Sequence, residues 1–366
     1  MKTVRLSAVG DILLSGTIAE MIESKCPEEP FIYISNELRK SDFVFGNLEC
    51  PLSNRGNPLK NKCCLHSPPE TVKSLKSAGF DVLSLANNHI FDYGFESFED
   101  TVFLLKRENI SYFGAGKNLE EARKPVILHV NGLSIGFVGY SWNDNGIWNK
   151  GIKTTKDKYE VPPLDKKIIT EDVRNLKEKT DIVIVSLHCG YESERYPLPS
   201  QRKLAHKVID SGASLILGHH PHVLQGIEEY NNGLIVYSLG NFVFPNVSYE
   251  RFNLIQKKEN RESMIFCCEI SKDGIRDFEV TPVKSNDYFQ PIILKGREKT
   301  AIIKKIENLS GGFKLPNYSH FWRVNRVRKD LPDATTSKTF NKVLFKIHRV
   351  RRRVLKTIIK RREGVS

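Results

Sequence analysis

The sequence predicts an α/β fold in which two β-sheets lie inside and helices cover them on the outside. Short apolar runs rich in β-branched residues alternate with helical segments through the first two-thirds of the 366 residues. Hairpin signals are added to this alternation, and the combination favours a layered sandwich. Polar side chains directly follow several predicted strands, which is where open α/β sheets bind ligands.

The individual elements follow from these patterns. Strands are expected at residues 3–9, 42–45, 81–85, 126–130, 133–138, 181–186 and 215–217, and helices at 68–78 and 95–107. Hairpins are expected to turn at Asn131-Gly132, Asn232-Gly233 and Asp273-Gly274, since such turns need positive φ at both central residues. The pattern weakens after residue 285. We therefore expect a domain at 1–285, an extension at 286–337 and a basic tail at 338–366.

The positive charge of the chain is concentrated in that tail. The net charge is +13, and eleven Lys or Arg but no Asp or Glu lie between Lys338 and Arg362, so the remainder carries only +2. Apolar residues in this segment recur at three- and four-residue steps, which predicts an amphipathic helix on an anionic membrane surface. A helix docked on the domain and a solvated tail are the alternatives. Since no nucleic-acid-reading motif accompanies the charge, no nucleic-acid partner is expected.

Cysteine usage and the N-terminus favour a cytoplasmic protein. Seven cysteines, an odd number without a C-x-x-C pair, argue against a disulfide scaffold. Residues 1–10 form a strand-like run and not a signal peptide, and no apolar stretch approaches the roughly 20 residues of a spanning helix. With the tail bound to lipid, the protein would be peripheral at the inner face of the membrane.

Carboxylate, amide and imidazole side chains recur immediately after the predicted strands. They are Asp11, Asn47, Glu49, Asn87, Asn88, His89, His188, His219, His220, His222 and Asn241. This mixture of donors suits a divalent metal such as Zn²⁺, Mn²⁺ or Fe. Two such ions about 3.5–4 Å apart, sharing one carboxylate, would generate a hydroxide nucleophile and stabilise a phosphoryl-like transition state.

The motifs around these residues resemble a known family. They are GD at 10–11, NLE at 47–49, NNHxxDxG at 87–94, HxGxE at 188–192, GHHPHVxQGxE at 218–228 and YSLGNFVF at 237–244. These motifs are similar to those of the CapA family, named for poly-γ-glutamate capsule synthesis, and the resemblance covers roughly residues 4–244. It implies a four-layer αββα sandwich of the calcineurin-like metallophosphoesterase type.

The resemblance also implies a role for each matching residue. The metal ligands would be Asp11, Glu49, Asn88, His188, His220 and His222, with Glu49 as the bridging acid. His89 would protonate the leaving oxygen. Together with the ligands Asn88 and Asp11, it makes up the set of candidate catalytic residues. Anchoring the last motif on Gly218 would instead favour His219 as a ligand.

Two positions depart from the pattern usual in metallophosphoesterases, and single residues have structural interpretations as well. Leu13 stands where Asp-x-His would place a histidine, and Glu49 replaces the usual bridging Asp. Asp11 alone could cap a helix, Asn88 could be a turn residue, and Glu192 could orient His188 or point at solvent. The shared position of the set at strand ends favours a functional site.

We therefore expect a metal-dependent hydrolase or transferase that acts on a phosphoester or a related bond in capsule or exopolysaccharide synthesis. The polymer or its precursor would be the partner. The alternative is a non-catalytic assembly component that keeps the fold and uses its polar cleft to bind polymer or partner proteins. Leu13 favours this alternative, whereas the retained histidines and Asn88 favour the enzyme.

Overall fold

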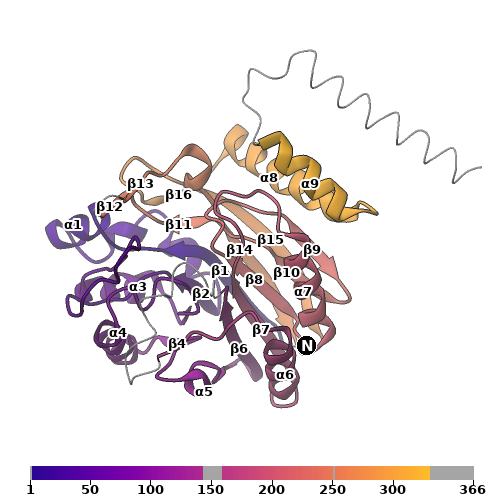
Figure 1. Cartoon of the computed structure of the whole chain (residues 1–366), viewed down its shortest axis with the longest axis horizontal. Coiled ribbons are helices and arrows are strands. Elements are labelled where there is room, and N and C mark those ends of the chain that lie inside the picture. The colour runs from indigo at the N-terminus through magenta and orange to yellow at the C-terminus, as the bar shows by residue number, and fades with distance from the viewer. Residues whose placement is uncertain (1, 143–158, 250–251, 330–366) are drawn as a thin grey trace, which may run out of the picture. The chain divides into compact units, whose positions relative to one another are not determined.

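The computed structural model describes residues 2–142, 159–249 and 252–329 (Figure 1). The predicted basic tail at 338–366 lies outside these residues. The chain divides into two compact units, Met1–Lys314 and Leu315–Ser366. The described part of the second unit contains helix α9 (Tyr318–Lys329). Both large sheets and the candidate site belong to the first unit.

The first large sheet has eight strands. Its order is β16-β15-β14-β1-β2-β3-β4, and β11 also pairs with β1. The strands are β1 (Val4–Ile12), β2 (Phe43–Leu48), β3 (Val82–Ser84), β4 (Ser111–Phe113), β11 (Asn241–Val243), β14 (Glu262–Ser271), β15 (Gly274–Ser285) and β16 (Pro291–Ile293). Strands β1 to β4 and β11 run parallel, so their carboxyl ends meet at one edge of the sheet.

The second large sheet has six strands in the order β5-β6-β7-β8-β10-β9. They are β5 (Val126–Val130), β6 (Leu133–Ser141), β7 (Ile182–His188), β8 (Leu215–His219), β9 (Ile227–Tyr230) and β10 (Gly233–Val236). The four central strands are parallel and each edge strand is joined by an antiparallel hairpin. A separate two-stranded sheet consists of β12 (Val247–Tyr249) and β13 (Phe252–Leu254).

An apolar core holds the two large sheets face to face. Phe45 of β2 and Phe137 of β6 are fully buried and stack with their ring centroids 6.3 Å apart. Val4, Leu6 and the other inward residues of β1 belong to the same core as the apolar residues of β7 and β8. Alternate residues of these strands point away from the core, because successive side chains of a strand face opposite sides.

Helices cover the outer faces of both sheets, as Figure 1 shows. They are α1 (Thr17–Ser24), α2 (Ser35–Leu38), α3 (Val72–Ala78), α4 (Phe95–Arg107), α5 (Leu119–Ala122), α6 (Lys166–Lys177) and α7 (Pro199–Asp210). Helix α8 (Gly296–Gly311) instead packs beside β9 and β15, and short 3₁₀ helices lie at Glu29–Phe31, Pro69–Thr71, Lys258–Arg261 and Gly312–Lys314. Helices α1 to α4 share a second core with the outer face of the first sheet. Helix α6 packs so closely on the other sheet that a Cβ on Gly136 would lie 2.7 Å from Leu176. The predicted four-layer α/β/β/α sandwich is therefore confirmed.

Two predicted turns lie one residue away from their observed positions. The Asn131-Gly132 turn is confirmed, with φ of 49° and 81°. The next hairpin turns at Asn231-Asn232, where both asparagines adopt positive φ and Gly233 already begins β10. In the third hairpin Ser271 pairs with Gly274, so the loop precedes the predicted position. Asparagine tolerates the left-handed region, which makes a following glycine unnecessary for the turn.

The pattern that fades after residue 285 nevertheless continues the fold. Strand β16 pairs with β15 at the edge of the first sheet. Ile302 and Ile306 of α8 are buried in the core between the sheets. The first compact unit accordingly extends to Lys314. None of the helices in the described ranges is long and apolar enough to cross a membrane.

Candidate metal centre

A polar cluster forms where the carboxyl ends of strands from both sheets meet. Its six members, Asp11, Glu49, Asn88, His188, His220 and His222, are contributed by β1, β7 and the segments after β2, β3 and β8. Strand register brings distant parts of the chain together, because Asp11 pairs with both Asn47 and Asn241 across parallel ladders. In the second sheet His188 pairs with His219 in the same way. The structure thus brings together all six predicted ligands, although metal binding by them stays a prediction.

The backbone adopts unusual conformations to place the last two histidines. His220 has a φ of 93° and His222 a φ of 56°, a region that residues other than glycine enter only rarely. Nearby, β1 approaches the turn before β11 so closely that a Cβ on Gly10 would lie 1.8 Å from the carbonyl oxygen of Gly240. Such strain persists where the surroundings enforce it, and it gathers at functional sites.

Glu49 is the most unusual member of the cluster. Its side chain is fully buried, and neither carboxylate oxygen has a hydrogen-bond partner among the described residues. Oε1 lies 3.6 Å from His188 Nε2 and 3.6 Å from His222 Nε2. Burial, followed by the charge of Asp11, raises the pKa of Glu49 well above its ordinary value. Because a buried, unpartnered carboxylate is costly, this arrangement fits a bound cation.

Asn88 and His220 converge with Glu49 on His188. Asn88 Oδ1 lies 2.8 Å from His188 Nε2, and His220 Nδ1 lies 3.2 Å from the same atom. Burial, together with the charge of neighbouring histidines, lowers the pKa of His188 well below its ordinary value and that of His220 to about 3. Both rings are therefore neutral at physiological pH, which is the form of imidazole that binds metals.

Asp11 has the same charge as Glu49 and a different environment. Oδ1 accepts a hydrogen bond from Asn47 Nδ2 at 2.8 Å and lies 3.2 Å from His219 Nδ1. Oδ2 accepts from the backbone N–H of His220 at 3.3 Å and lies 3.3 Å from His222 Nδ1. Burial alone would raise the pKa of Asp11, but the hydrogen bonds from the two histidines outweigh it and hold the pKa well below its ordinary value.

His89 lies beside the cluster in a second arrangement of charges. Its Nδ1 is 2.6 Å from Asp92 Oδ2, which also accepts the backbone N–H of Leu65 at 2.7 Å. The buried Lys62 donates to Asp92 Oδ1 and to the carbonyl oxygen of Asn88. Sequence reasoning assigned no role to Asp92 or Lys62. Asp92 could have been found from its position three residues after His89, whereas Lys62 lies in a loop without a local signal.

The structure also shows the positions of His219, Glu192 and Leu13, whose roles the sequence left open. His219 is fully buried against Phe45, with ring centroids 5.8 Å apart, and its Nε2 has no hydrogen-bond partner among the described residues. His220, and not His219, offers a nitrogen within 4.8 Å of both Glu49 and His222. Glu192 is exposed, and Leu13 is buried in the apolar core between the first sheet and its helices.

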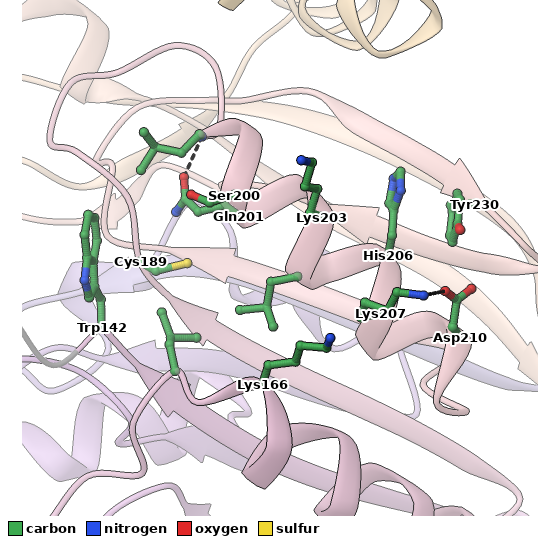
Figure 2. Close-up of a pocket in the computed structure, with 13 residues that line it drawn as sticks. Trp142, Lys166, Cys189, Ser200, Gln201, Lys203, His206, Lys207, Asp210 and Tyr230 are labelled. Carbon is green, nitrogen blue, oxygen red and sulfur yellow. Dashed lines mark hydrogen bonds and ion pairs between the residues drawn. The ribbon is translucent and has the colours of Figure 1, made fainter. Parts of the chain in front are cut away.

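A groove of about 710 Å³ lies apart from this cluster (Figure 2). It runs along α7 and is bordered by Trp142, Lys166, Cys189 and Tyr230. Cys189 directly follows His188, and consecutive residues of an extended chain face opposite sides of a sheet. The groove therefore lies on the helical side of the second sheet and takes no part in the metal centre.

Comparison with known proteins finds a matching family, relatives and solved structures that are similar to this chain. The family model described as "Bacterial capsule synthesis protein PGA_cap" matches residues 5–246. The chain is 36% identical over 280 residues to the PGA biosynthesis protein CapA of Bacillus subtilis, covering 76% of this chain and 70% of that protein. It is 36% identical over 247 residues to the capsule biosynthesis protein CapA of Bacillus anthracis, covering 65% and 59%. Among solved structures, the sulfate thiohydrolase SoxB of Thermus thermophilus has a TM-score of 0.46 at 15% identity, over 79% of this chain and 48% of that one.

Replacing Lys62 with Met is expected to lower the free energy of unfolding by about 3–5 kcal/mol, because it leaves the buried Asp92 carboxylate without its cation. Urea unfolding monitored by circular dichroism measures the change. Lys60→Met, at an exposed position two residues earlier, should stay within about 0.5 kcal/mol of wild type. The double variant Lys62→Met/Asp92→Asn should regain part of the loss. A cost below about 1 kcal/mol for Lys62→Met would contradict the assigned ion pair.

Proposed function

The chain belongs to the PGA_cap family of bacterial capsule synthesis proteins, and we propose that it acts there as a metal-dependent hydrolase or transferase on a phosphoester or related bond. One observation carries the proposal. The buried Glu49 carboxylate has no hydrogen-bond partner among the described residues and faces histidine nitrogens from two strand ends. A cation would satisfy these groups together.

Oxygen and nitrogen donors of this kind suit Mn²⁺, Zn²⁺ or Fe. The six predicted ligands would hold the metal. Potential ligand atoms of Glu49, His220 and His222 lie within 4.8 Å of one another, as do those of Asp11, Glu49 and His188. Asn88 Oδ1 lies 2.8 Å from His188 Nε2. When bound, such an ion supplies a Lewis acid and lowers the pKa of coordinated water toward neutrality. The capsule polymer or its precursor is the substrate class that the family suggests.

His89 is placed to donate a proton to the leaving group. Asp92 accepts the Nδ1 proton and fixes the orientation of the ring, which leaves Nε2 to deliver a proton to an oxygen. Burial lowers the pKa of His89, and the charge of Asp92 counteracts this effect. The imidazolium is therefore a stronger acid than free histidine and gives up its proton more readily.

A non-catalytic role as a polymer-binding component of the assembly machinery is the second candidate. It is favoured by Leu13, whose buried side chain adds no donor to the cluster at the position where metallophosphoesterases usually have a histidine. The two candidates differ in whether the metal-loaded protein turns over any substrate.

Removal of metal provides the first test of the enzyme. Protein stripped with a chelator should hydrolyse neither 4-nitrophenyl phosphate nor its bis-ester, and reloading with Mn²⁺, Zn²⁺ or Fe²⁺ should restore hydrolysis, because no other group in the cluster activates water. Release of 4-nitrophenolate measures both states. Glu49→Gln should stay inactive after reloading. If the reloaded wild type is inactive on these esters and on phosphorylated capsule precursors, the binding role is favoured instead.

Replacing His89 with Ala should lower turnover by roughly two to four orders of magnitude while metal content is unchanged. The loss should be larger for phenyl phosphate than for 4-nitrophenyl phosphate, since a poorer leaving group depends more on an acid. Steady-state kinetics with both esters measure the difference, and His66→Ala is the matched control at a histidine outside the cluster. An equal loss with both esters, or loss of metal with His89, would remove the assigned acid role.

We also propose that residues 338–362 bind an anionic membrane surface, on the strength of their charge and apolar periodicity. The full chain should co-sediment with vesicles containing phosphatidylglycerol, and a chain truncated after Pro332 should remain in the supernatant. Each basic residue near such a surface contributes about 1 kcal/mol, so binding should weaken as salt rises. Equal sedimentation of the two chains would exclude this role for the tail.

A further inference from the structure

The YSLGNFVF motif at 237–244 supplies two buried side chains that contact His222, and neither has a part in the proposed chemistry. Asn241 is 2% exposed and lies on β11, where it pairs with Asp11 of β1 across the parallel ladder. Its Oδ1 lies 2.8 Å from His222 Nδ1. Phe244 is also buried and packs against the ring of His222, with centroids 5.1 Å apart. Both contacts act on the same histidine of the cluster.

The orientation of the Asn241 amide is fixed by Gln256. A backbone carbonyl can only accept hydrogen bonds, so the atom of Gln256 that faces the Pro245 oxygen at 3.4 Å is the donor Nε2. Gln256 Oε1 then faces Asn241 and accepts from its Nδ2 at 2.9 Å. The backbone N–H of Gln256 donates to Asn246 Oδ1 at 2.7 Å, which holds the residue in place. The remaining polar atom of Asn241, Oδ1, is therefore the one directed at His222.

This chain of amides determines which nitrogen of His222 carries a proton. The Asn241 oxygen can only accept, and Asp11 Oδ2, 3.3 Å from the same Nδ1, is an acceptor as well. Nδ1 therefore keeps its proton whether or not Nε2 is protonated. Nε2 lies 3.6 Å from Glu49 Oε1 and is the nitrogen that remains for a cation. Histidines that bind metals generally donate their other N–H to an acceptor, which fixes the tautomer and the ring orientation.

Asn241 differs in this respect from Asn88. Asn88 presents its oxygen to His188 Nε2, which is also the nitrogen that faces Glu49, so the three groups converge on one place. Asn241 presents its oxygen to Nδ1 of His222, whereas Nε2 of the same ring faces Glu49. Asn88 is thus placed as a ligand, and Asn241 as a group that orients a ligand.

From these contacts we propose that Asn241, oriented by Gln256, is a positioning residue that keeps the proton on Nδ1 of His222 and leaves Nε2 to bind the metal. The inference deepens the proposed function and rests on it only in requiring that the cluster binds a metal.

Nitrogen-15 NMR of the full chain, labelled at histidine, tests the assignment of the proton. In the metal-free protein the Nδ1 proton of His222 should give a slowly exchanging resonance, which His222→Ala identifies. In Asn241→Leu this proton should exchange with water about tenfold faster, because one of its two acceptors is removed. In the wild type loaded with Zn²⁺, Nδ1 should keep its proton and Nε2 should have none.

Metal affinity measures the consequence of this orientation. Asn241→Leu should bind Zn²⁺ about 10–100-fold more weakly than wild type, measured by competition with a chromophoric chelator. Asn241→Asp keeps an acceptor for the Nδ1 proton and should regain most of the loss. Gln256→Leu should change affinity in the same direction by a smaller factor, because the Asn241 amide can then turn over. Asn253→Leu, the same substitution at an exposed position of β13, is the matched control.

Zn²⁺ bound to Nδ1 of His222 would overturn the proposal, as would an Asn241→Leu variant with the exchange rate or the Zn²⁺ affinity of the wild type. Circular dichroism of each variant establishes folding, and Gln256→Leu is decisive if Asn241→Leu unfolds. A wild type that binds no metal would contradict the proposed function, and the exchange rates of the metal-free protein would still decide this inference. Metal-dependent hydrolysis with an unchanged exchange rate in Asn241→Leu would do the reverse.

Discussion

The free-energy cost of burying the Glu49 carboxylate determines what the other groups of the site have to supply. An ion of this size loses several kcal/mol of hydration on entering a protein interior, and here no protein hydrogen bond from the described residues offsets the loss. The negative Asp11 nearby increases the penalty. Neutral His188 and His220 and the amide of Asn88 add donor atoms without adding positive charge. Burial alone would lower the pKa of His222, but the charges of Glu49 and Asp11 outweigh it and raise this pKa to about 10, so His222 offsets part of the negative charge. A bound cation, as proposed above, would offset the rest.

Asp11 and Glu49 are chemically similar groups whose pKa values are shifted in opposite directions by their environments. Asp11 accepts the backbone N–H of His220, so it fixes the start of the loop that carries the last histidines. The same loop contains the positive φ angles of His220 and His222. Strain of this kind, of order 1–3 kcal/mol per residue, persists only when surrounding contacts enforce it. In this structure the bonded carboxylate holds the loop in place, and the unbonded carboxylate faces His188 and His222.

The sequence predicted the parts of the site that depend on local rules. Asp11 and His188 could be located because side chains at the carboxyl ends of parallel strands gather at one edge of a sheet. The choice between His219 and His220 could not be made in this way, since both follow the same strand. It depends on the burial of His219 against Phe45 and on the left-handed turn at His220, and both are consequences of tertiary packing. Lys62 was missed for the same reason, because its partner Asp92 is distant in sequence and its loop has no periodicity.

The position of Lys62 explains how two adjacent residues can serve different purposes. Asn88 directs its side-chain oxygen to His188, whereas the ring of His89 turns to Asp92. Lys62 donates both to the carbonyl oxygen of Asn88 and to Asp92, so one cation fixes the backbone of the amide ligand and the partner of the acid. Within a low-dielectric interior such a shared donor resists displacement of either group. In the proposed enzyme, the distance between the ligand Asn88 and the acid His89 would therefore be fixed by Lys62, a side chain that plays neither role, and the leaving oxygen of a substrate would have to fit that spacing.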